Sequence, residues 1–125
     1  MDAVSDEEVT SSLYWASRKG HKKVVQILLD NGADVNAQRR SLRFGNALQA
    51  ASFEGHEQVV QILLDRNANV NAQGGWCGNA LQAAALEGHE KVVQILRDKG
   101  ADVRATGGFY GNALQAASRE GHEGG

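Results

Sequence analysis

Four histidines, each directly after a glycine, recur along this 125-residue chain at His21, His56, His89 and His122. Imidazole nitrogens bind metals and act as general bases, so a repeated pattern of histidines invites either interpretation. A metal ion needs its nitrogen ligands within about 2.0–2.1 Å, whereas equivalent side chains on successive packed helices lie roughly 8–10 Å apart. We therefore expect no metal site and predict a structural role, hydrogen bonding at the start of a helix.

Other side chains do not combine into a catalytic centre. Ser52 and Ser118 fall at small-residue positions that face the predicted core, away from any base. The glycine pairs at 74–75 and 107–108 lack the Lys-Ser/Thr sequence of a phosphate-binding loop. Cys77, the single cysteine, is expected on a loop tip, where it would be exposed and oxidisable. The sequence predicts a protein that is not an enzyme, uses no cofactor and has no small-molecule substrate.

A tandem repeat must position all of these residues. The string Gly-Asn-Ala-Leu-Gln-Ala-Ala begins at Gly45, Gly78 and Gly111, which are 33 residues apart. The first interval between Gly-His pairs is 35 residues, so the first repeat contains two extra residues. We place them in the segment 38–44, because insertions fall in exposed loops.

Each repeat predicts a short inner helix followed by an outer one. Asn46, Asn79 and Asn112 are natural N-caps for the inner helix, which continues Ala-Leu-Gln-Ala-Ala. The Asn and Gln side chains of these strings are expected to form caps and bonds between repeats. After each of the first three Gly-His pairs, Val-Val-Gln-Ile-Leu fits an amphipathic helix of about three turns.

The outer helices have clear stop signals. Gly32 and Gly100 can adopt the left-handed conformation that ends a helix, and Asn67 is the best substitute for glycine in the middle copy. The polar segment that follows each outer helix is predicted to be a hairpin-like turn. The core should be formed by apolar residues of both kinds of helix, namely Leu48, Leu81, Val60, Val93, Leu63 and Leu96.

The two ends of the chain depart from the repeat. Ser5 and Glu8 form a capping box, so the first helix should begin near Asp6 and be longer than its counterparts, as suits an N-terminal cap. At the other end, Gly124-Gly125 cannot continue an outer helix. We expect a fragment or a curtailed array whose residues 112–125 fray. The predicted domain spans residues 1–125, with a capping repeat at 1–45, repeats at 46–78 and 79–111, and a half repeat at 112–125.

These features resemble the ankyrin repeat. The loop string Gly-Ala-Asp-Val-Asn-Ala is present at residues 32–37 and is kept in part at 100–103, while the middle copy reads Asn-Ala-Asn-Val-Asn-Ala at 67–72. The resemblance covers residues 11–123 and implies an all-α solenoid of seven helices, four inner and three outer. The family's usual Thr-Pro-Leu-His is replaced by Asn-Ala-Leu-Gln in three copies, a variety similar to ankyrin arrays of fungal nucleotide-binding signalling proteins.

Composition and charge limit the function further. The net charge of −2 gives no overall bias towards nucleic acid or an anionic membrane. No apolar run approaches the roughly 18 residues of a membrane span, and the N-terminus lacks the basic start of a secretory signal. We expect an intracellular, cytoplasmic protein. Residues 11–45 carry seven basic and two acidic side chains, whereas residues 1–10 carry four acidic ones, which can neutralise this basic patch.

Recognition is expected where near-identical repeats differ, because packing does not dictate the residue there. The resemblance places such positions, at inner-helix ends and loop tips, along a concave groove, and aromatic and Arg residues dominate binding energy. The alternative is that the loop aromatics pack between adjacent turns. The candidate partner-binding residues are Phe53, Leu86, Arg119, Trp76, Phe109, Tyr110, Arg39, Arg40 and Arg43.

Three functions remain open. The first is a non-catalytic protein-binding module that presents a groove to a partner protein. The second is weak end-to-end self-association of an otherwise monomeric chain, because a missing outer helix would leave Leu114 uncovered. The third is binding of an acidic or phosphorylated partner through the basic first repeat, which would weaken steeply with salt.

Overall fold

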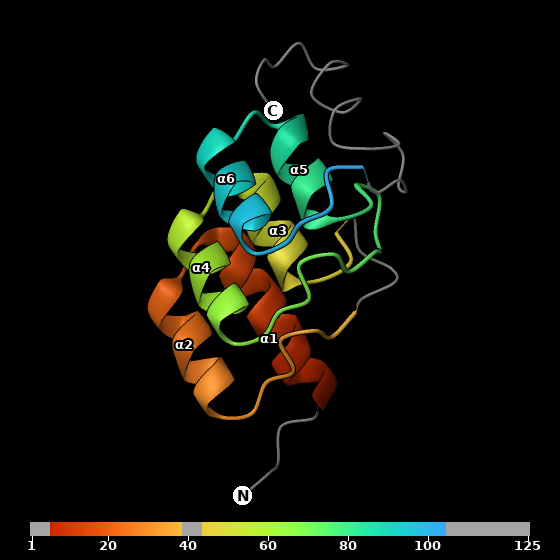
Figure 1. Ribbon diagram of the computed structural model, residues 1–125. Coiled ribbons are helices and arrows are strands. Elements are labelled where there is room, and N and C mark those ends of the chain that lie inside the picture. The colour runs from red at the N-terminus through yellow and green to blue at the C-terminus, as the bar shows by residue number, and fades with distance from the viewer. Residues whose placement is uncertain (1–5, 39–43, 105–125) are drawn as a thin grey trace, which may run out of the picture.

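The computed structural model describes residues 6–38 and 44–104. Within them the chain forms six helices in three antiparallel pairs (Figure 1). The inner helices are α1 (Asp6–Lys19), α3 (Ala47–Glu54) and α5 (Ala80–Leu86), and the outer helices are α2 (Lys22–Asp30), α4 (Glu57–Asp65) and α6 (Glu90–Asp98). Each inner helix lies beside the next inner helix and each outer helix beside the next outer one. This arrangement confirms the predicted all-α repeat solenoid.

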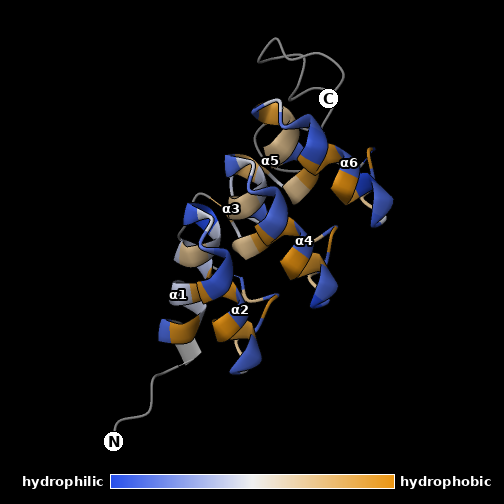
Figure 2. Cartoon of the chain, turned by 90° about the vertical axis from the view of Figure 1, so that its left-hand side faces the viewer, coloured by the Kyte–Doolittle hydropathy of each residue, from blue (hydrophilic) through white to orange (hydrophobic). Residues whose placement is uncertain are grey.

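Figure 2 shows the inner and outer helices as two parallel rows. The only β-structure among the described residues consists of isolated bridges, between Phe44 and Gly75 and between Gly74 and Gly78. The predicted seventh helix and the predicted fraying of residues 112–125 lie outside the described residues. So do Ser5 and the inserted residues of the first loop, and the domain boundaries stay predictions.

Local signals begin and end the helices as expected. The side chains of Asn46 and Asn79 accept hydrogen bonds from the backbone N–H groups of Gln49 and Gln82, at 2.9 and 2.8 Å. Each cap therefore satisfies a backbone donor that the first helical turn leaves open. After the outer helices, Gly32, Asn67 and Gly100 adopt φ values of +93°, +72° and +95°. Asn67 is the only described non-glycine residue in this left-handed region.

The segments after the outer helices are turns, as predicted. The backbone N–H of Asn36 donates to the side chain of Asp34 at 2.9 Å, and Asn71 bonds in the same way to Asn69 at 3.1 Å. An Asx turn of this kind folds the chain back without a sheet.

The main core lies between the two rows of helices. All six apolar residues predicted to form it are at most 4% exposed, and Ala51 and Ala84 pack among them. These small side chains allow the helices to approach closely. The first helix begins at Asp6 and is 14 residues long, against 8 and 7 for α3 and α5, and Leu13 holds the core position in it.

Candidate interaction surface

A second apolar cluster is formed by the inner helices together with the residues that precede them, apart from the main core. We call it the loop-side cluster. Its buried members are Tyr14, Phe44, Ala50, Cys77, Ala83 and Leu86, with Phe53 partly buried against them. Phe44 contacts Phe53 with a ring separation of 4.7 Å. The loop-side cluster therefore packs the loops against the inner helices and underlies the surface that these two parts form together.

Arg18 connects the first two repeats along this surface. Its guanidinium lies 5.3 Å from the ring centre of Trp15 and 5.7 Å from that of Phe44, within the range of a cation–π contact. Its Nε also donates to Glu54 Oε2 at 3.5 Å. Since both charged side chains are about one third exposed, the ion pair contributes little stability. It fixes the position of an Arg beside two aromatic rings.

The predicted partner-binding residues fall into three groups. Trp76 lies at the second loop and is 40% exposed, and Phe53 is partly buried at the end of α3. Leu86 is 2% exposed, so it has almost no surface to offer a partner and acts as a packing residue of α5. The others lie outside the described residues, namely Phe109, Tyr110, Arg119, Arg39, Arg40 and Arg43.

The expected exposure of Cys77 is wrong. The residue is 1% exposed and belongs to the loop-side cluster. The adjacent Trp76 is exposed and Cys77 points inward, because the loop closes against the inner helices just before Gly78 and α5. Cys77 therefore packs as a small apolar residue rather than as a surface thiol.

Sequence reasoning missed Trp15 as a surface residue. It is 44% exposed on α1, and its ring meets that of Tyr14 edge to face at 5.3 Å. The equivalent positions in the next two repeats are Ala50 and Ala83, both fully buried. The signal was therefore present in the sequence, since a large aromatic residue stands where the next two repeats both have alanine.

Two of the three described Gly-His pairs use the histidine to join neighbouring repeats. His56 Nε2 lies 2.9 Å from the carbonyl oxygen of Arg18, and His89 Nε2 lies 2.9 Å from that of Phe53. Because a carbonyl only accepts, Nε2 must carry the proton. The predicted structural role at the start of the outer helix is confirmed, although the bond reaches the preceding repeat rather than capping the helix.

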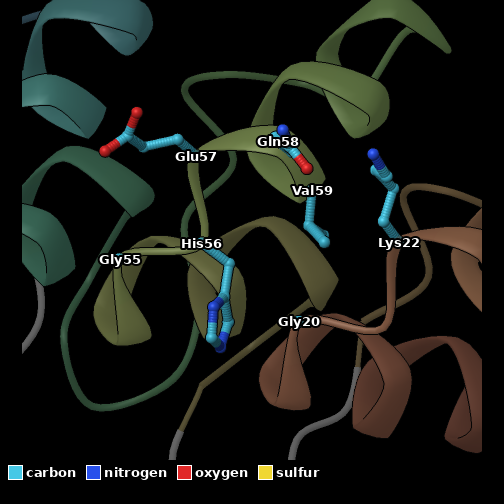
Figure 3. Close-up of a pocket in the computed structure, with 7 residues that line it drawn as sticks. All are labelled: Gly20, Lys22, Gly55, His56, Glu57, Gln58 and Val59. Carbon is cyan, nitrogen blue, oxygen red and sulfur yellow. The ribbon is translucent and has the colours of Figure 1, made fainter.

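An open depression of about 350 Å³ lies at the first of these junctions (Figure 3). The side chain of His56 is directed towards Gly20, while Lys22 and Glu57 lie at the edges of the depression. The His56 ring is committed to a backbone carbonyl, so it is not poised as a base in this depression. Among the described residues no three His, Cys, Asp or Glu side chains are grouped as metal ligands. No described helix is long and apolar enough to cross a membrane.

The basic character of the first repeat is visible in part. Lys19, Lys22 and Lys23 are exposed around the junction of α1 and α2. Asp30, one of the two acidic residues in this segment, forms an ion pair with Arg66 of the next repeat. Exposed lysines in this number are compatible with a solvated face as well as with an acidic ligand.

Comparison with known proteins agrees with the geometry. The family model described as ankyrin repeats (3 copies) matches residues 13–107 and also residues 49–124. A search of curated proteins finds no significant match to the chain. The finer likeness to the arrays of fungal nucleotide-binding signalling proteins stays a prediction.

Proposed function

The chain belongs to the ankyrin repeat family, and from this premise we propose that it is a non-catalytic module that holds a partner protein against its loops and inner helices. Ankyrin repeats are generally protein–protein interaction modules. A rigid stack of helix pairs supports the proposal, because it presents an extended surface with little conformational entropy left to lose on binding.

The observation that carries the proposal is the exposure of two tryptophans, Trp15 and Trp76, each next to a buried member of the loop-side cluster. They are 44% and 40% exposed; the ring of Trp15 contacts that of Tyr14, and Trp76 directly precedes Cys77, both of which are buried in the cluster. Trp and Arg residues are enriched among those that dominate binding energy, and Arg18 lies against Trp15. A partner that covers these rings would remove apolar area from water at a preformed site.

The proposed contact surface keeps the variable positions of the repeats and adds Trp15. Leu86 is left out because it is buried. The proposed contact residues are Trp15, Phe53, Trp76, Phe109, Tyr110 and Arg119, with Arg39, Arg40 and Arg43 at one end of the footprint.

The test compares binding of a captured partner to the full chain and to two variants. Trp76→Ala and Phe109→Ala should each weaken the affinity by more than about 1 kcal/mol, while the free energy of unfolding stays nearly unchanged. Gln26→Ala is the control, because Gln26 is exposed on an outer helix, away from this surface. If both aromatic variants instead lower the melting temperature as a core deletion would, these rings are structural wedges and the proposal fails.

The exposed lysines of the first repeat favour a second candidate function, binding of an acidic or phosphorylated partner. Screening weakens interactions between exposed charges, so its affinity should fall steeply between low and high salt. An affinity that is insensitive to salt but sensitive to Trp76→Ala would exclude this second candidate and support the first.

A further inference from the structure

The outer helix of the first repeat carries an apolar side that nothing covers within the described residues. Val24 and Ile27 on α2 are 46% and 59% exposed. The equivalent valines of α4 and α6, Val59 and Val92, are both 1% exposed because the preceding outer helix packs against them. The equivalent isoleucines are partly buried against the main core. Figure 2 shows α2 at the end of its row, with apolar residues on it.

This side of the first repeat also lacks polar contacts that the later repeats make with their preceding neighbour. His56 and His89 each bond to a carbonyl of the preceding repeat, whereas His21 is exposed and makes no such bond within the described residues. Each bonded histidine ring packs on the glycine that follows the preceding inner helix. A Cβ on Gly20 would approach the His56 ring to 2.7 Å, and a Cβ on Gly55 would do the same at His89. His21 occupies the equivalent position in the first repeat, but no glycine among the described residues packs against its ring.

A second polar contact links consecutive loops in the same direction. The amide of Asn36 donates to Asn67 O at 3.1 Å and accepts from Asn69 N–H at 2.7 Å. Asn71 repeats this pair of bonds with Gly100 O at 3.1 Å and Asp102 N–H at 2.8 Å. In the first repeat the equivalent carbonyl and N–H belong to the exposed residues Gly32 and Asp34, and no Asn among the described residues binds them.

We propose that this side of α2, with His21 and the Gly32–Asp34 turn, is a docking face for one further ankyrin repeat, supplied by polypeptide outside these 125 residues. The argument is continuity with the interfaces inside the chain, where the same positions receive a repeat. The occupant needs a glycine after its inner helix to accommodate His21 and an Asn in its loop to pair with Gly32 and Asp34. A terminal cap would carry a polar outer face here instead.

A second copy of this chain does not meet these requirements with its last described repeat. The loop position held by Asn36 and Asn71 is Arg104 there. An Arg side chain has no acceptor for the N–H of Asp34. The face therefore fits a repeat like that at 46–78, which has both Gly55 and Asn71.

The test tethers such a repeat to the full chain. A copy of residues 46–78 is fused ahead of Met1 through a flexible Gly/Ser linker, which gives a high effective concentration at the face. One repeat cannot bury its apolar side alone, so it should fold only when docked. We expect the amide hydrogens of the tethered copy to exchange at least about tenfold more slowly than in a matched fusion with Val24→Asp and Ile27→Asp. Helical content should rise by the equivalent of α3 and α4.

One further fusion and one measurement on the unfused chain separate the possible outcomes. Asn71→Ala in the tethered copy alone should weaken its protection, since it removes the loop contact with the Gly32–Asp34 turn. Unprotected amides in the tethered copy, or equal protection with and without the two Asp substitutions, would overturn the proposal. The unfused chain is also measured by light scattering. Self-association that Val24→Asp and Ile27→Asp abolish would assign the face to a second copy of the chain and overturn the proposal. Trp76→Ala in the original chain, with the tethered copy unchanged, should leave all of these results as they are. The proposed partner-binding function is therefore tested separately.

Discussion

His56 crosses from the second repeat to the first, where its Nε2–H donates to the backbone carbonyl of Arg18 at 2.9 Å. While its backbone accepts this bond, the side chain of Arg18 contacts Trp15, Phe44 and Glu54. One residue near the end of α1 therefore joins the packing between repeats to the candidate interaction surface. The same relationship recurs between His89 and Phe53, whose ring lies against Phe44.

Replacing this histidine should destabilise the stack. His56→Ala removes a half-buried hydrogen bond between repeats and leaves the Arg18 carbonyl without its partner, so the free energy of unfolding should fall by about 1–3 kcal/mol in a denaturant titration. His21→Ala is the matched control and should change it by less than about 0.5 kcal/mol, because His21 is exposed and lacks the equivalent bond. Equal effects of the two variants would show that the bond to the preceding repeat is not what stabilises this junction.

The N-cap of α5 provides a prediction about a single local bond. Asn79→Ala removes the acceptor for the N–H of Gln82 and should lower the free energy of unfolding by about 0.5–2 kcal/mol, measured by chemical denaturation. Asn79→Thr keeps an oxygen acceptor and should recover most of that loss, in line with the Thr that is usual at this position in the family. A Thr variant as unstable as the Ala variant would mean that Asn79 acts through packing rather than capping.

Local rules predicted most of the fold because the interactions they describe involve neighbours in sequence. The cap of Asn46 involves a residue three positions away, and the left-handed Asn67 depends on its own backbone. Repetition then supplied the long-range arrangement, since equal units that bury one apolar side must stack. For this reason the core leucines and valines could be identified without a structure.

The surface could not be predicted equally well, because exposure depends on how loops return over the helices. Cys77 and Leu86 look like variable surface positions in the aligned repeats, yet both are buried in the loop-side cluster. Trp15 is exposed, although the equivalent Ala50 and Ala83 lie in helices of the same row and are fully buried. Val24 and Ile27 likewise match valines that are buried and isoleucines that are partly buried in later repeats, and they are exposed because no outer helix among the described residues packs against this side of α2.

Leu81 should be among the most sensitive positions in the core. It is 2% exposed on α5, in the cluster shared by inner and outer helices. Leu81→Ala should cost about 2–5 kcal/mol, since it loses buried apolar area and leaves a cavity. Val103→Ala, at a position that is 47% exposed, is the control and should have little effect on the denaturation midpoint. A loss below about 0.5 kcal/mol for Leu81→Ala would show that the site relaxes freely.

Ser52 should tolerate loss of its hydroxyl group. Its Oγ is buried and has no hydrogen-bond partner among the described residues, and the equivalent position in the next repeat is Ala85. Ser52→Ala removes an unsatisfied polar group from the core, so the free energy of unfolding should stay constant or rise by up to about 1 kcal/mol. Thermal denaturation would detect this as an unchanged or higher melting temperature. A clear decrease would indicate that the hydroxyl is paired in solution.

Cys77 should react slowly with a thiol reagent in the folded protein. Its side chain is 1% exposed beneath the second loop, so modification requires the loop to open. We expect a rate at least about tenfold below that of the denatured chain, followed by the absorbance of the released thiolate. Trp76→Cys in a Cys77→Ala background moves the thiol by one residue to an exposed position and should react at nearly the denatured rate. If the native Cys77 reacts as fast as this variant, the loop does not hold the residue in the cluster, and the support that Cys77 gives to the interaction surface is lost.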